Sequence, residues 1–158
     1  MAKHKFEDFL VGVPDEYKGF VTTVHELLQG DYKGRIQTTK NGLSLSYAMP
    51  KTQRILGFSF RDSDLMVHIN AENHAKYPDV LHSLPQVIVS QIDEASYCKK
   101  FDDLQKCWST CEPGYDFYIG EKHFQKCRYY CFKLKVDAES IPFLLEIIKS
   151  EHKERANV

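Results

Sequence analysis

The sequence predicts an α+β protein with an antiparallel sheet of about five to six strands, helices at both ends and short helices in the middle. Three observations predict it: apolar and polar residues alternate in strand-length runs, turn signals join these runs into hairpins, and apolar residues near both ends recur at helical spacing. The expected sheet is a meander followed by a C-terminal hairpin. With 158 residues and 42% apolar content, the chain is expected to form a single domain over residues 1–158.

Helices are expected in three regions of the chain. Residues 14–30 begin with Pro-Asp-Glu, continue with apolar residues at helical spacing and end at a glycine. Pro78 and Pro85 each stand where a short helix could begin, so two or three short helices packed on one sheet face are expected within residues 71–96. Residues 141–148 carry one apolar helical stripe, and the charged residues 151–155 are expected to fray from its end.

The strands of the meander are predicted from two hairpins. Lys40-Asn41-Gly42 joins residues 35–39 to residues 43–47, and Asn-Gly is typical of two-residue hairpin turns because it tolerates positive φ. Leu43, Leu45 and Tyr47 alternate with two serines, as in a half-buried strand. A second hairpin is expected between residues 53–60 and 65–70. Together these runs predict four antiparallel strands in chain order.

A third hairpin is expected in the second half. Residues 115–119 and 123–136 read as strands on either side of Gly120-Glu121-Lys122. In the longer strand, Lys126, Arg128 and Tyr130 fall on the same face as several apolar residues. Arginine suits bidentate contacts to carboxylate or phosphate, so these three residues are candidates for binding a small anionic or planar ligand. Placement of both cations at the rim of the sheet is the alternative interpretation.

Charge and hydropathy narrow the classes of partner. The net charge is −1 and the sequence pI is about 6.6, which removes the overall attraction on which nonspecific nucleic-acid binding depends. Nucleic acid is therefore an unlikely partner, although the half from Cys98 to Lys135 is mildly basic. No apolar stretch has the length of a signal peptide or a membrane span. These features predict a cytoplasmic protein that does not bind membranes.

Five cysteines stand in the second half of the chain. Cytosolic thiols stay reduced, so buried thiols, metal ligands or reactive groups are expected before disulfides. Four of them follow the spacing C-x8-C-x3-C-x15-C and are candidate ligands of a structural zinc ion: Cys98, Cys107, Cys111 and Cys127. On the predicted strand, Cys127 and Cys131 would lie about 13 Å apart. Cys131 is therefore expected to be a packing residue.

Three interpretations of the cysteines remain open at this stage. They are reduced thiols without metal, a structural zinc site, and a thiol-dependent redox protein that uses Cys107 and Cys111. The sequence contains no P-loop, no G-x-G-x-x-G and no H-E-x-x-H, so no catalytic residues are assigned. The leading hypothesis is a binding or sensing domain without enzymatic activity. The redox protein is its main alternative, and a weak nucleic-acid binder is a third.

A resemblance to a known group adds to this picture. The segments Gly114-Tyr115-Asp116-Phe117-Tyr118-Ile119-Gly120 and Phe124-Gln125-Lys126-Cys127-Arg128-Tyr129 are similar to motifs of small uncharacterised bacterial proteins. With the run Leu43-Ser44-Leu45-Ser46-Tyr47, the chain resembles the YdhG/YjbR group of α+β domains over residues 20–150. The resemblance implies the fold and gives weight to Cys127, and it implies no reaction.

Overall fold

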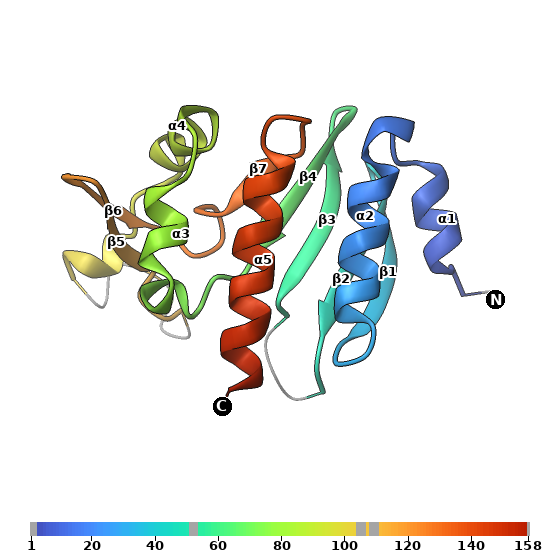
Figure 1. The fold of residues 1–158 in the computed structure, drawn as a ribbon, viewed down its shortest axis with the longest axis horizontal. Helices are drawn as coiled ribbons and strands as arrows, with labels where there is room; N and C mark the ends of the chain where they lie inside the picture. Colours follow the sequence, from blue (N-terminus) through green and yellow to red (C-terminus); the bar gives the residue numbers. More distant parts are fainter. Residues whose placement is uncertain (1–2, 51–53, 104–106, 108–110, 158) are drawn as a thin grey trace.

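The computed structural model of the chain describes residues 3–50, 54–103, 107 and 111–157. Within these residues, seven strands form a five-stranded antiparallel sheet and a separate two-stranded hairpin. Helices stand near the N-terminus, in the middle and at the C-terminus (Figure 1). The structure therefore confirms the predicted α+β class, the antiparallel sheet and the placement of the helices.

The main sheet contains the predicted meander in chain order. Its strand order is β1-β2-β3-β4-β7, all antiparallel. The bounds are β1 Lys33–Thr39, β2 Gly42–Ala48, β3 Leu56–Arg61, β4 Asp64–Ile69 and β7 Lys133–Lys135. Positive φ angles occur at Gly42 and Asp62, where the two predicted hairpins turn. The predicted strand over 53–60 begins partly outside the described residues.

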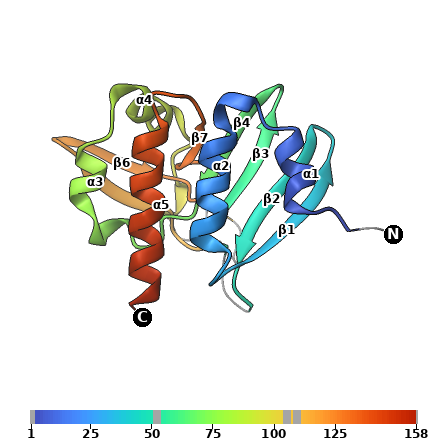
Figure 2. The ribbon, with the colours of Figure 1, turned by 45° about the vertical axis from the view of Figure 1, so that its right-hand side comes forward.

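Three helices lie on the same side of this sheet (Figure 2). They are α1 Phe6–Val11, α2 Asp15–Leu28 and α5 Ile141–Ala156. The core between the layers contains every second residue of β2, β3 and β4, for example Leu45, Phe58 and Val67. Apolar and polar residues alternate along the strands because one face of the sheet is covered by helices and the opposite face is more polar. The prediction contains no counterpart of α1.

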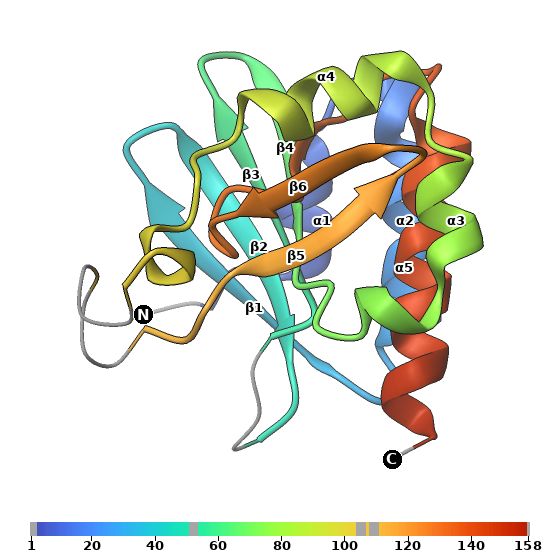
Figure 3. The same cartoon turned by 90° about the vertical axis from the view of Figure 1, so that its left-hand side faces the viewer.

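Short helices connect β4 to the second half, as predicted. They are η1 His74–Lys76, α3 Pro78–His82, α4 Gln86–Glu94 and η2 Lys99–Phe101. Both Pro78 and Pro85 stand at a helix start, where a missing N–H costs no hydrogen bond. Helix α3 contacts η1, α5 and β5, and α4 contacts β7. Figure 3 shows these helices beside the small hairpin.

The long strand predicted over residues 123–136 is wrong. The small hairpin consists of β5 Tyr115–Ile119 and β6 Lys122–Lys126. The chain then turns, and the Cys131 N–H donates to the Cys127 carbonyl at 2.9 Å. It resumes as β7, which pairs with β4 in the main sheet. Alternation continues on both sides of the turn because the two pieces are buried in different sheets, so the pattern alone could not show the break.

The predicted fraying after residue 150 is also wrong, because α5 continues to Ala156 and buries the carboxylate of Glu151 completely. Four donors reach the two carboxylate oxygens. Asn73 donates its backbone N–H at 3.0 Å and its side-chain amide at 2.8 Å, Tyr77 donates its hydroxyl at 2.6 Å, and Arg155 donates Nε–H at 2.8 Å. Burial next to this carboxylate raises the pKa of Tyr77. A full set of donors allows the charge to remain buried.

No helix in the described ranges has the length and apolar character that crossing a membrane requires.

Replacing Glu151 by Gln should destabilise the protein by roughly 2–3 kcal/mol, because an amide NH2 group would face a donor and one buried partner would lose its acceptor. Urea unfolding measures the change. Glu146→Gln, at an exposed position of the same helix, is the control and should alter stability by less than about 0.5 kcal/mol. Equal stability of the two variants would contradict a structural role for the buried carboxylate.

Candidate metal centre

The four cysteines predicted as metal ligands line one cavity of about 220 Å³. These four cysteines are Cys98, Cys107, Cys111 and Cys127. None of the five cysteines is in a disulfide. The cavity lies between the chain that enters η2, the segment before β5 and the chain that leaves β6. The structure thus brings together residues that are up to 29 positions apart in sequence.

A short backbone ladder positions two of these cysteines. Tyr97 forms an isolated antiparallel bridge with Lys126. The Cys98 N–H donates to the Gln125 carbonyl at 3.3 Å, and the Cys127 N–H donates to the Ser96 carbonyl at 2.8 Å. Because neighbouring residues of extended chain point to opposite sides, Cys98 and Cys127 lie on the same side as diagonal neighbours.

Gly114 allows the segment before β5 to approach this ladder closely. A Cβ atom at this position would overlap the carbonyl oxygen of Lys126 and come within 3.0 Å of the Cβ of Cys98. With no side chain in the way, the Gly114 N–H reaches the Cys98 Sγ at 3.2 Å. Glycine is therefore required here by close packing.

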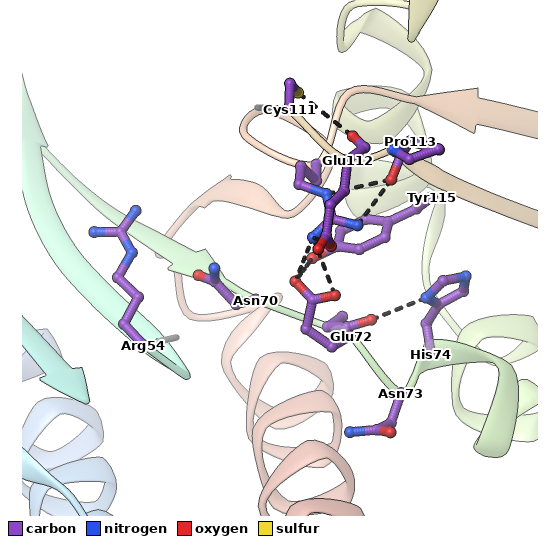
Figure 4. A network of polar contacts seen from close by, with 12 residues as sticks. Arg54, Asn70, Glu72, Asn73, His74, Cys111, Glu112, Pro113 and Tyr115 are labelled. Carbon is purple, nitrogen blue, oxygen red and sulfur yellow. Dashed lines mark hydrogen bonds and ion pairs between the residues drawn. The ribbon is translucent and has the colours of Figure 1, made fainter. Parts of the chain in front are cut away.

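Cys111 lies on the facing wall of the cavity. Burial and a hydrogen bond shared with Cys107 raise the pKa of the Cys111 thiol. Its Sγ–H donates to the Glu112 carbonyl at 3.4 Å (Figure 4), and the Lys100 ammonium donates to the Cys111 carbonyl oxygen. A redox nucleophile needs a lowered pKa, and the raised value at Cys111 is the opposite of that requirement.

The positions of the thiols are not yet those of bound ligands. Among the residues that the structure describes, no group of three or more His, Cys, Asp or Glu side chains could hold a metal ion as it stands. A tetrahedral zinc with Zn–S bonds near 2.3 Å needs its sulfurs about 3.8 Å apart. Closing the four thiols onto one ion therefore requires the side chains to turn inward within the cavity.

Cys131 lies apart from this cavity. It is fully buried in the hydrophobic core, and burial raises the pKa of its thiol. Its packing role agrees with the prediction, but the distance argument used for it depended on the incorrect strand. The turn brings the Cys131 N–H to the Cys127 carbonyl, so strand length does not separate the two residues; Cys131 is buried in the core, whereas Cys127 lines the cavity.

The three residues predicted to bind a ligand do not form one strand face. Lys126 donates from Nζ to the carbonyls of Asp93 at 2.8 Å and Ala95 at 3.0 Å, which ties β6 to the end of α4. Tyr130 lies in the turn and is 55% exposed. The predicted strand on which they were grouped ends at Lys126, where β6 ends.

Arg128 points inward and contacts three segments of the chain. Its Nη1 pairs with Glu72 at 2.9 Å and with Glu112 at 3.3 Å, and its Nη2 donates to the Pro113 carbonyl at 2.8 Å. The guanidinium lies over the ring of Tyr115, 5.6 Å from the centroid. Figure 4 shows Glu72, Glu112 and Pro113 converging on this point. The Arg128 side chain is 13% exposed and holds the wall of the cysteine cavity in place.

The sequence analysis did not predict a polar pair, Arg54 and His68, that lies beside the turn after β6. The Nη2 of Arg54 lies 2.6 Å from Nδ1 of His68, and Nε2 of His68 lies 3.3 Å from the Arg128 carbonyl. Arginine can only donate, so Nδ1 accepts, Nε2–H donates and the imidazole is neutral. Burial and the Arg54 charge lower the pKa of His68 to about 4. No sequence signal pairs them, because Arg54 lies in the connection between β2 and β3.

The chain matches no family model, and no significant similarity to a curated protein or to a solved structure is found. The resemblance to the YdhG/YjbR group therefore stays a prediction from the motif residues.

The buried His68 should make stability depend on pH. Its folded pKa of about 4 lies below the ordinary value of 6.5, so between these values the unfolded chain binds a proton that the folded protein does not. Stability should therefore fall as pH falls from about 6.5 to about 4, by roughly 3 kcal/mol in total.

Urea unfolding at a series of pH values measures this dependence. His68→Gln, which keeps an acceptor and a donor, should flatten it, whereas His82→Gln at an exposed position should leave it unchanged. An equally steep fall in the His68→Gln variant would show that other groups cause the effect.

Proposed function

We propose that this protein is a binding domain whose second half is organised by one zinc ion held by four thiolates. The observation that supports the proposal is that Cys98, Cys107, Cys111 and Cys127 line a single cavity, while Cys131 is buried elsewhere. Four thiolates around a closed tetrahedral ion are the usual ligands of a structural zinc site. Such a site leaves no open coordination position for catalysis.

Several groups that line the cavity suit a metal-thiolate centre. Zinc with four thiolates carries a net charge of −2, and the cation of Lys99 lines the cavity, whereas Arg128 there is already paired with carboxylates. The Gly114 N–H already points at the Cys98 sulfur, as outer-shell donors do in metal sites. A bound metal would also deprotonate Cys111 despite its raised pKa, because a coordinated thiol loses its proton.

The proposed zinc would stabilise one part of the structure, and the rest of the protein would fold without it. The core beneath α2 and α5 is extensive without any contribution from the four cysteines that line the cavity. By contrast, η2 and the segment from residue 111 to 114 are connected to β6 by the short ladder and by polar contacts. A metal would add a covalent-strength link between these pieces.

Metal analysis of the purified protein tests the proposal. We expect about one zinc ion per chain, and Cys98→Ser or Cys127→Ser should reduce the bound zinc by at least tenfold, since each removes one of four ligands. Cys131→Ala is the matched control, because it removes a thiol outside the cavity and should retain the metal. A protein that is free of metal, and that takes up neither zinc nor cobalt after reduction, would overturn the proposal.

Chelation should act locally. Removing the metal should speed amide exchange at Cys98, Gly114 and Cys127, whose N–H groups hold the cavity together, while α2 and strands β2 to β4 keep their protection. Hydrogen exchange read by NMR or mass spectrometry measures the difference. Unfolding of the whole protein on chelation would contradict a local role, and unchanged exchange at all three amides would contradict a bound metal.

Iodoacetamide mapping at neutral pH separates this proposal from the redox alternative. A thiol-dependent redox protein requires one fast-reacting cysteine among Cys107 and Cys111, whereas zinc-bound thiolates at a closed site should react slowly until the metal is removed.

A further inference from the structure

The face of the main sheet opposite the helices carries a continuous polar row. In the strand register, Arg35 of β1 lies beside Ser46 of β2, which lies beside Gly57 of β3. Gly57 in turn pairs with His68 of β4, which pairs with Lys133 of β7. The row therefore crosses all five strands, with a cation at each edge and small residues in the middle.

A cavity of about 250 Å³ lies along this row. Its floor is formed by Ser44 and Ser46 of β2 together with Gly57 and Ser59 of β3. These side chains are short, so the sheet is hollowed where they meet and longer side chains rise around them. The hydroxyl groups give the floor hydrogen-bond donors that can rotate toward a ligand.

Arg54 is held over one side of this cavity. Its Nη1 would lie 3.0 Å from a Cβ at residue 57, so the guanidinium occupies the space that glycine leaves open. His68 fixes its orientation by accepting from Nη2 at 2.6 Å. Because His68 is neutral, this contact orients Arg54 without neutralising its charge. His68 is in this sense a positioning residue.

The cavity has positive charge without compensation in the described part of the chain. Arg54 and Lys133 both line it, and neither makes an ion pair with a described carboxylate. No Asp or Glu is among the residues that line the cavity. Two residues further along β7, by contrast, Lys135 points to the same face and pairs with Asp64 at 3.7 Å.

We propose that this cavity binds a small anion through a phosphate or carboxylate group. Arg54 would offer the paired donors that such groups accept, Lys133 a second positive charge, and the serine hydroxyls further hydrogen bonds. The volume suits a small metabolite better than a dinucleotide. The inference rests on the binding role proposed above and is independent of the metal.

Titrations of the purified full chain with inorganic phosphate and with acetate, at constant ionic strength and pH 7, test this site. We expect saturable shifts of the Ser46 and Gly57 amide signals in NMR spectra, with a Kd of about 1 mM or tighter for at least one anion. Saturation by phosphate alone identifies a phosphate ligand, and saturation by acetate alone identifies a carboxylate ligand. Absence of saturation with both anions would overturn the proposal.

Two pairs of variants separate a specific site from general attraction. Arg54→Gln and Lys133→Gln should each weaken binding at least tenfold. Arg61→Gln and Lys135→Gln remove cations from the same strand face outside the cavity and should leave Kd unchanged. Equal weakening in all four variants would overturn the proposal.

Zinc content measured on the same samples distinguishes the two proposals. Anion binding by a zinc-free protein would support this cavity while rejecting the metal centre. A zinc-loaded protein that binds neither anion would support the metal centre and reject the anion-binding cavity.

Discussion

The buried carboxylate of Glu151 is the constraint on which the arrangement of the two halves depends. Three of its four donors come from the segment that leaves the meander, where Asn73 and Tyr77 meet α5. Arg155, one helical turn further on, donates to the carbonyl of Asn70 at 2.9 Å. These polar contacts fix the path of the chain out of β4, because losing one of them would leave a buried polar group without a partner and would destabilise the fold.

The position of this segment determines where Glu72 lies, and Glu72 pairs with Arg128. Arg128 then connects the two proposed sites. Its side chain supports Glu112 and Pro113 beside the cysteine cavity, and its carbonyl lies 3.3 Å from Nε2 of His68. Both proposed sites therefore adjoin the turn that follows β6. This geometry also explains why Arg128 contacts its own protein and does not offer its charge to a ligand.

The four cysteines show which features of a site can be predicted from sequence spacing and which cannot. The four thiols grouped from the sequence line one cavity, although the strand assumed for Cys127 and Cys131 does not exist. Cys107 and Cys111 are only four residues apart, so their nearness could be expected from spacing alone. The spacing did not show the ladder that places Cys98 and Cys127 on the same side, since it depends on a bridge between chain segments almost 30 residues apart.

Local patterns in the sequence determined the meander, the helices near both ends and the short helices after Pro78 and Pro85. Each of these elements buries one face through a period that is visible within a few residues. Only the tertiary structure decided where the strand after Gly120 breaks, which charges are buried and which partners the charged residues meet. Glu151, Arg128 and Arg54 look alike in the sequence as charged residues. What separates them is the set of partners that distant segments supply, because the cost of burying a charge depends on donors and acceptors that no local pattern records.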